Sequence, residues 1–235
     1  MHIPDGFINA GVSAAAGVAS IGGIGVSLKK AGETLEDKQA PLAGLVAAFV
    51  FAVQMLNFPV ASGTSGHLLG GVLAAVLVGP WAGSICITLV LTVQALFFAD
   101  GGLSALGLNV LNMAIVGGIG GYAVFVAARG VLPKTRPMVA LASAIAAFLS
   151  VIMASIAFFI EYALGGVGEV SLSAVFAAMV GVHALIGVGE AVITALAVSA
   201  VLAVRPDLVY GASDLMPQLE VRSSQLEDRT SSVGR

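Results

Sequence analysis

Charged residues are scarce in this 235-residue chain. Only 10% of its residues are Asp, Glu, Lys or Arg, 58% are hydrophobic, and the mean hydropathy is +1.04. A soluble domain usually carries ~25% charged residues. The composition therefore excludes an ordinary soluble enzyme and predicts an all-α integral membrane protein. The formal net charge of −3 is less informative than the positions of the charges.

Several chemical motifs are missing as well. The single cysteine, Cys86, lies in an apolar run, so no intrachain disulfide can form and a packing role is favoured. The chain has neither a G-x-x-x-x-G-K-[ST] phosphate loop nor an H-E-x-x-H motif, so we expect neither ATP hydrolysis by this chain alone nor zinc protease activity. No basic region precedes the first apolar run, and we therefore expect no cleavable signal peptide.

Long apolar stretches are what the chain does have, and each is close to the ~20 residues that cross a bilayer. The predicted spans are 7–28, 42–60, 63–79, 83–99, 107–128, 138–160 and 175–204. The uncharged stretch from Gln39 to Ala99 is divided at Ser62–Gly66 and at Gly79-Pro80, because such residues interrupt helices. After Asp207 the sequence becomes polar. We expect a membrane-embedded domain over 1–207 and a flexible tail over 208–235.

The charges predict how the chain is oriented in the membrane. With seven spans, all ten Lys and Arg residues fall on the C-terminal side. The other side carries only acidic residues, namely Asp5, Asp100, Glu161 and Glu169. By the positive-inside rule, the N-terminus is predicted to be outside and the C-terminus cytoplasmic.

The first two residues, Met1 and His2, have the pattern of a metal chelate. A histidine in second place brings together the α-amine of Met1, the backbone nitrogen of His2 and Nδ1 of its ring. The backbone nitrogen binds only after losing its proton, which nickel(II) or copper(II) in square-planar, nitrogen-rich geometry achieves best. The alternative is that His2 is an ordinary polar residue on a frayed terminus.

His67 is the predicted fourth ligand, because three nitrogens leave one corner of a square-planar site open. It follows the Gly/Ser-rich stretch Ser62–Gly66 and, in the predicted topology, lies on the same membrane face as Met1 and His2. A histidine at membrane depth is costly in lipid and is a candidate for function. The alternative is a loop histidine that is satisfied by hydrogen bonds.

Other polar residues lie within the predicted spans. His183 and Glu190 are seven residues apart and share one helix face, which favours a buried pair that stabilises the bundle over a role in a metal or coupling path. Gln94, Asn109 and Asn112 fit two roles equally well. They either orient a ligating histidine or form hydrogen bonds between helices.

Small residues form a stripe on one predicted helix, at Gly44, Ala48 and Ala52. Such stripes let helices approach closely in membranes. The stripe either packs against other helices of this chain or docks another membrane subunit, and the sequence favours neither.

Four stretches of the chain resemble one family of membrane proteins. They are MHIPDGF, SGTSGHLLGGVLAAVLVGPWAG, VQALFFADGGLSALGLNVLNM and GVHALIGVGEAVITA. They are similar to the CbiM/NikM family over about residues 1–207. Members of this family are the substrate-binding S components of energy-coupling-factor (ECF) transporters for cobalt and nickel.

The resemblance implies seven spans, an N-terminal loop inserted into the bundle, and nickel(II) or cobalt(II) as the transported substrate. The metal would be bound by Met1, His2 and His67. The implied partners are a transmembrane T component and two ABC-type ATPases in a bacterial or archaeal cell membrane, with no nucleic acid. A small accessory membrane subunit is left open. The chain itself would be a transporter subunit and not an enzyme.

Two other classes compete with this hypothesis. A stand-alone secondary metal permease would transport without ATPases. An integral-membrane metalloenzyme would need an open metal position and a general base, and a site filled by nitrogen ligands offers neither.

Overall fold

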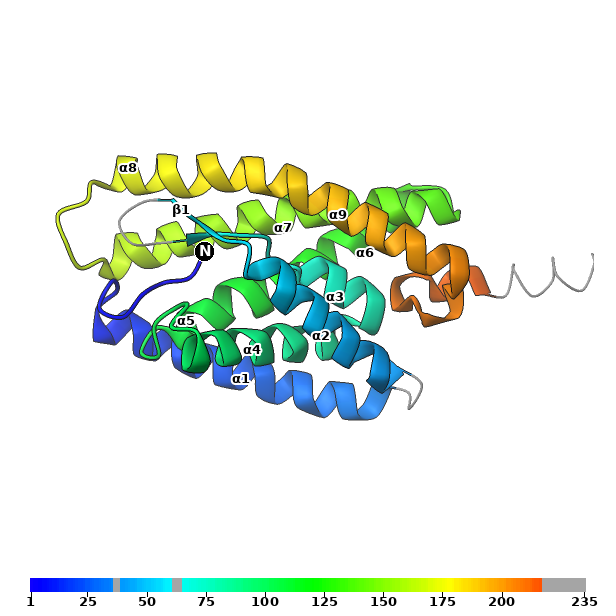
Figure 1. Cartoon of the computed structure of the whole chain (residues 1–235), viewed down its shortest axis with the longest axis horizontal. Coiled ribbons are helices and arrows are strands. Elements are labelled where there is room, and N and C mark those ends of the chain that lie inside the picture. Colours follow the sequence, from blue (N-terminus) through cyan, green and yellow to red (C-terminus); the bar gives the residue numbers. More distant parts are fainter. Residues whose placement is uncertain (36–38, 61–64, 217–235) are drawn as a thin grey trace, which may run out of the picture.

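The chain folds into one elongated bundle of apolar helices (Figure 1), shown by a computed structural model that describes residues 1–35, 39–60 and 65–216. Within these residues, five helical segments are long and apolar enough to cross a membrane: Ala10–Thr34, Pro80–Phe97, Leu106–Val131, Arg136–Gly165 and Leu172–Val204. The predicted class, an all-α membrane protein, is confirmed. The predicted count of seven spans goes beyond these five segments.

Helix α1 (Ala10–Thr34) begins at Asn9, whose side chain accepts a hydrogen bond from the backbone N–H of Val12. This contact satisfies a backbone donor that the first helical turn leaves free. Helix α2 (Ala40–Gln54) is apolar but shorter. It faces the core with Val46, Val50 and Gln54.

The predicted break at Gly79-Pro80 is confirmed. Gly79 has a φ of 89° and separates helix α3 (Gly71–Val78) from helix α4 (Pro80–Phe97). Proline suits the first turn of a helix because the N–H it lacks would have no partner there. The span predicted over 63–79 is wrong in extent, because in its described part, residues 65–79, only the eight residues of α3 are helical, and all of them are buried.

A non-helical segment precedes α3. Strands β1 (Phe58–Pro59) and β2 (Ser65–Gly66) pair antiparallel, and residues 67–70 follow without regular structure. Irregular backbone at membrane depth requires hydrogen-bond partners from the protein. Two buried side chains supply them, as described below for Leu69 and Gly70.

Two of the long segments contain π-helical turns. Helix α5 (Leu106–Val110), the π-helix η2 (Leu111–Gly120) and helix α6 (Gly121–Val131) are continuous. After helix α7 (Arg136–Gly165), helix α8 (Leu172–Phe176), the π-helix η3 (Ala177–Gly181) and helix α9 (Val182–Val204) form the last long segment. π-Helical turns occur frequently at functional sites, and η3 ends two residues before His183.

The first part of the predicted tail packs on the bundle. The 3₁₀ helices η4 (Pro206–Leu208) and η5 (Tyr210–Leu215) bury Val209, Ala212 and Leu215. The rest of that predicted tail, residues 217–235, lies outside the described residues.

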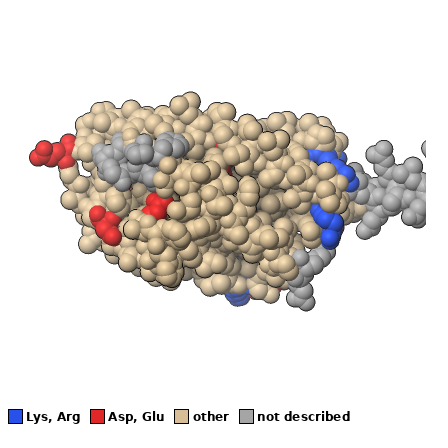
Figure 2. All heavy atoms as spheres, in the orientation of Figure 1, with Lys and Arg blue, Asp and Glu red and all other residues tan. Residues whose placement is uncertain are grey.

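Two surface features bear on how the bundle sits among other molecules. In the view of Figure 2, Asp and Glu side chains gather at the end that holds the N-terminal loop, and Lys and Arg lie toward the other end.

The stripe Gly44, Ala48 and Ala52 is exposed on α2. Packing of this stripe against helices of the same chain, one of the two predicted alternatives, is therefore wrong.

Candidate metal site

The N-terminal segment lies inside the bundle. The exposed fractions of Met1, His2 and Ile3 are 0%, 3% and 0%. Asn109 on α5 fastens this segment, because its Oδ1 accepts from the N–H of Ile3 at 2.8 Å and its Nδ2 donates to the carbonyl of Ile3 at 3.2 Å. The N–H of Gly102 donates to the same carbonyl at 2.8 Å. A frayed N-terminus, one of the alternatives for His2, is therefore wrong.

Residues 99–102, the turn after α4, form a cradle for this segment. Gly101 has a φ of 88°, and a Cβ placed on it would lie 3.0 Å from Cδ2 of His2. A Cβ on Gly102 would collide with the backbone of Asp5. In the sequence, two glycines directly after Asp100 were a signal of a tight, functional turn.

The ring of His2 has a polar side chain at each nitrogen. Its Nε2 lies 3.1 Å from Oε1 of Gln94, and its Nδ1 lies 3.1 Å from Oδ1 of Asp100. An oxygen that accepts hydrogen bonds therefore faces each ring nitrogen, and when the proton is on Nε2, toward Gln94, Nδ1 presents a lone pair. Of its two predicted roles, Gln94 fills the first, which is to orient a candidate ligand.

His67 lies directly against His2. The centroids of the two rings are 4.4 Å apart, with the planes tilted by 32°. Nδ1 of His67 donates to the carbonyl of Leu68 at 2.8 Å, which leaves the lone pair on Nε2. This Nε2 is buried and has no hydrogen-bond partner among the described residues. It is a nitrogen donor whose lone pair is free for a ligand.

The loop that carries His67 is held from two helices. Glu190 on α9 accepts hydrogen bonds from the N–H groups of Leu69 and Gly70 at 2.8 Å and 2.6 Å. Gln54 on α2 donates to the carbonyl of Leu69 at 2.6 Å. The buried carboxylate thus replaces the backbone partners that a helix would provide, and it fixes the backbone next to His67.

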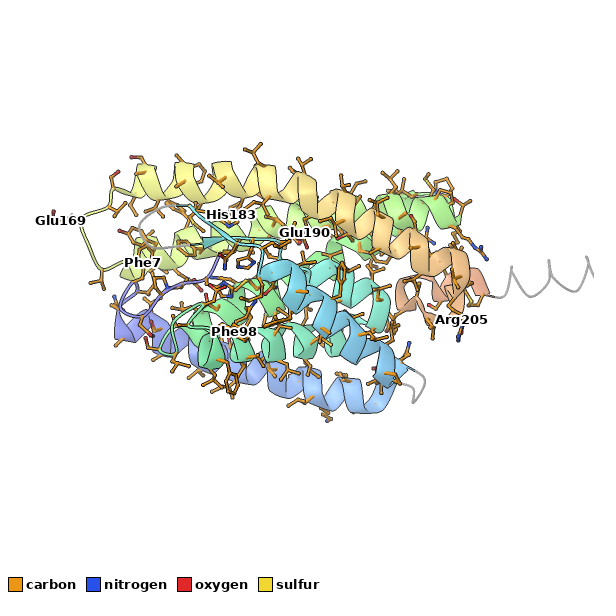
Figure 3. The ribbon with its side chains drawn as sticks, in the orientation of Figure 1. Phe7, Phe98, Glu169, His183, Glu190 and Arg205 are labelled. Atoms are coloured by element: carbon orange, nitrogen blue, oxygen red, sulfur yellow. The ribbon has the colours of Figure 1, made fainter. Side chains whose placement is uncertain are left out.

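The predicted pair of His183 and Glu190 is wrong. Both residues lie on the buried side of α9 (Figure 3), but Glu190 bonds the loop, and Nδ1 of His183 donates to the carbonyl of Met179 at 2.7 Å. Nε2 of His183 is buried without a hydrogen-bond partner among the described residues. Nδ2 of Asn112 donates a hydrogen bond to Glu161 on α7 at 2.6 Å, so of its two predicted roles Asn112 has the second, a hydrogen bond between helices.

The surroundings keep these nitrogens neutral. Burial lowers the pKa of the Met1 α-amine from 8.0 to about 4. Burial also lowers the pKa of His2, although Asp100 partly offsets this, and it holds the pKa of His67 well below its usual range, helped by the nearby α-amine. Neutral amines and imidazoles are the forms that bind metals.

Within the described residues, no three His, Cys, Asp or Glu side chains form a group that could hold a metal ion. The candidate site has two imidazoles, and its remaining donors would be the α-amine and the backbone nitrogen of His2. Both of these donors belong to the main chain, so a search for groups of side chains does not include them.

The sequence comparison assigns the chain to a family. The family described as "CbiM: Cobalt uptake substrate-specific transmembrane region" matches residues 2–208. The chain belongs to the CbiM family. The predicted resemblance is confirmed, and with it the assignment as a membrane protein that crosses the bilayer several times.

Relatives of this CbiM-family chain include transport proteins of different lengths. It is 40% identical to a putative fused nickel transport protein NikMN of Archaeoglobus fulgidus, over 89% of this chain and 68% of that protein. It is 36% identical to a putative metal transport protein of Haloquadratum walsbyi, over 94% of this chain and the whole of that protein. The cobalt transport protein CbiM of Sorangium cellulosum is 37% identical over 72% of this chain and 76% of that protein.

A solved structure shares the fold of this CbiM-family chain. The crystal structure of a truncated transition metal transporter superposes with a TM-score of 0.80 and is 34% identical. The match covers 86% of this chain and 99% of that protein.

Proposed function

We propose that this chain is the metal-binding membrane subunit of an importer for cobalt(II) or nickel(II). The ligands are the α-amine of Met1, the backbone nitrogen and Nδ1 of His2, and Nε2 of His67. The observation that supports this best is the unpartnered, buried Nε2 of His67, on a ring whose centroid is 4.4 Å from that of His2.

The type of donor favours these cargo ions. An all-nitrogen set suits nickel, cobalt and copper, while magnesium and calcium prefer oxygen ligands. The names of the relatives, which are nickel, cobalt and metal transport proteins, narrow the choice to nickel and cobalt. With four nitrogens, including a deprotonated amide, we expect square-planar coordination.

We further propose that the chain works as the S component of an ECF-type complex, with a T component and two ATPases. Seven membrane segments are then formed by the five long helices together with α2 and α3, and the N-terminus is outside. The acidic and basic ends of the bundle in Figure 2 support this orientation through the positive-inside rule. The exposed stripe on α2 supports docking of another membrane helix.

The test of the site uses the position of a purification tag. A tag before Met1 turns the α-amine into an amide, which removes its charge and lone pair. Protein with the tag at the N-terminus should retain less than about a tenth of the nickel that C-terminally tagged protein binds, because the chelate loses a ligand. The measurement is metal content after purification and dialysis. Equal loading of the two proteins would contradict the proposed ligand set.

A pair of matched variants separates the two buried histidines. His67 and His183 both have an unpartnered Nε2 within the described residues. The variant His67→Ala should lose nickel, and His183→Ala should bind as the unaltered protein does. The reverse result would move the site to α9.

A further inference from the structure

The carboxylate of Asp100 stands between the proposed metal site and the surface. Its Oδ1 lies 3.1 Å from Nδ1 of His2, and the exposed fractions of the two side chains are 14% for Asp100 and 3% for His2. The other proposed ligands, Met1 and His67, are 0% and 1% exposed. An ion that reaches His2 past Asp100 would therefore meet a carboxylate first.

The contact between Asp100 and His2 depends on the tautomer of the His2 ring. With the proton on Nε2, which faces Oε1 of Gln94, Nδ1 and the carboxylate oxygen present lone pairs to each other, and this is the tautomer that a metal bound at Nδ1 requires. Nδ1 accordingly has no hydrogen-bond partner within the described part of the chain. Two acceptors at this distance repel each other unless a positive charge lies between them.

The spacing of the two atoms fits a shared cation. A transition metal ~2.1 Å from a nitrogen and from an oxygen ligand, at about a right angle, holds these two donors ~3.0 Å apart. The observed separation of 3.1 Å between Nδ1 of His2 and Oδ1 of Asp100 matches this distance between two donors. Nδ1 of His2 and Oδ1 of Asp100 are thus close enough to bind one ion as neighbouring ligands.

The backbone is held in an unfavourable conformation to keep Asp100 there. Ala99 has a φ of 51°, and it is the one non-glycine residue with a positive φ in the described parts of the chain. Such a conformation persists only where the surroundings fix it, and it is found frequently at functional sites. Here the N–H of Asp100 donates to the carbonyl of Gln94 at 3.2 Å, and Nδ2 of Asn57 donates to the second carboxylate oxygen at 2.9 Å.

We propose that Asp100 is a capture ligand for the transported divalent metal ion, which it binds together with His2 before the ion reaches the buried nitrogen site. This inference rests on the proposed function and adds a step to it. Oδ1 of Asp100 and Nδ1 of His2 replace water molecules of the hydrated ion. The carboxylate is then exchanged for the α-amine, for the backbone nitrogen of His2, whose proton passes to water, and for His67. Asp100 thereby speeds both binding and release without being a ligand of the final site.

The test is the rate of nickel binding, measured by stopped-flow absorbance with nickel(II) chloride on the full, untagged chain. In Asp100→Asn the association rate should fall about tenfold or more, because the first ligand is lost. The dissociation rate should fall in parallel, so that the equilibrium affinity changes by less than about threefold. Glu169→Gln is the matched control, since it removes an acid at the same end of the molecule (Figure 3) and should leave the rates unchanged.

The salt dependence separates a ligand from a general attraction. At ~0.5 M potassium chloride the Debye length is only ~4 Å. Attraction of the ion by a distant charge is then screened, whereas the slower association caused by the loss of a ligand remains. An association rate of Asp100→Asn within about twofold of the unaltered protein, or a deficit that vanishes at high salt, overturns the inference. A faster dissociation with lost affinity also overturns it, because Asp100 would then be a ligand of the final site.

Two controls keep the result interpretable. A single symmetric peak in size-exclusion chromatography shows that the variant is folded, and Asp100→Ser replaces Asp100→Asn if the latter aggregates. If the unaltered chain binds no nickel, the proposed function fails together with this inference. If it binds nickel at the same rate with and without Asp100, only the role of Asp100 fails.

Discussion

At the scale of single residues, the site depends on which nitrogen of each histidine is free. Nδ1 of His67 donates a hydrogen bond to the carbonyl of Leu68, and Nε2 of His2 donates one to Gln94 in the tautomer that metal binding requires. The two lone pairs therefore fall on different ring atoms. The sequence predicted His2 from its place behind the α-amine and His67 from its place on the same membrane face. The assignment of the lone pairs, however, requires contacts between distant segments.

The proton count on binding tests the electrostatics of these residues. The pKa of the buried α-amine is lowered to about 4, and the pKa values of His2 and His67 are lowered as well. At pH 7 these groups are therefore already neutral in the folded protein, and only the backbone amide of His2 has a proton to lose. We expect about one proton released per nickel ion at pH 7.

The same shifts predict the pH profile of nickel affinity. Nickel affinity should fall about tenfold per pH unit from pH 8 to 6, because one proton competes with the metal for the backbone nitrogen of His2. It should fall more steeply at lower pH, where His2 and His67 take up protons and, near pH 4, the α-amine does so too. A pH-stat titration and a series of binding isotherms measure both quantities. Release of two protons at pH 7 would show that the amine is charged before binding, and would contradict its burial as a neutral group.

At the scale of elements, the prediction from the sequence differs most from the structure in the segment before α3. Apolar composition predicted a span over 63–79, but residues 67–70 are irregular because Glu190 and Gln54 bond the backbone of Leu69 and Gly70. Composition cannot reveal such contacts, since the partners lie on other helices. The boundary at Gly79-Pro80 was predictable because its cause is local.

Glu190 should control the position of His67 through this backbone. The variant Glu190→Gln replaces one acceptor oxygen with a donor, so one buried N–H of Leu69 or Gly70 loses its partner at a cost of ~1–3 kcal/mol. We expect nickel affinity to fall about tenfold, with a lower melting temperature.

Glu161→Gln is the control for this change, because it alters another buried glutamate that bonds Asn112 and not the His67 loop. Nickel titration of both variants decides the matter. Equal loss of affinity in the two would mean that Glu190 acts only through the stability of the bundle.

At the scale of the whole molecule, the helical bundle and its membrane class followed from composition alone, because burial in lipid needs nothing more specific than apolar length. The packing of Val209, Ala212 and Leu215 did not, since three apolar residues in a polar stretch give no clear period. The stripe on α2 was visible in the sequence, but only the structure shows that Ala48 faces outward.

This outward face predicts the effect of a larger side chain. Ala48→Leu should reduce copurification with the membrane partner by about tenfold, because close approach of two backbones needs small residues. Nickel binding should be unchanged, since Ala48 is exposed. Ala15→Leu, at an exposed position of α1, is the matched control. Full copurification of Ala48→Leu would show that the stripe faces lipid.

The hydrogen bonds of Ile3 also set an order of events during synthesis. Ile3 is synthesised before Gly102 and Asn109, which hold it and lie about a hundred residues later in the chain. Contacts of such long sequence separation form late in folding. The N-terminal segment therefore docks only after α4 and α5 are in the membrane. The proposed ligands on this segment join His67 late in folding, although they precede it in the chain.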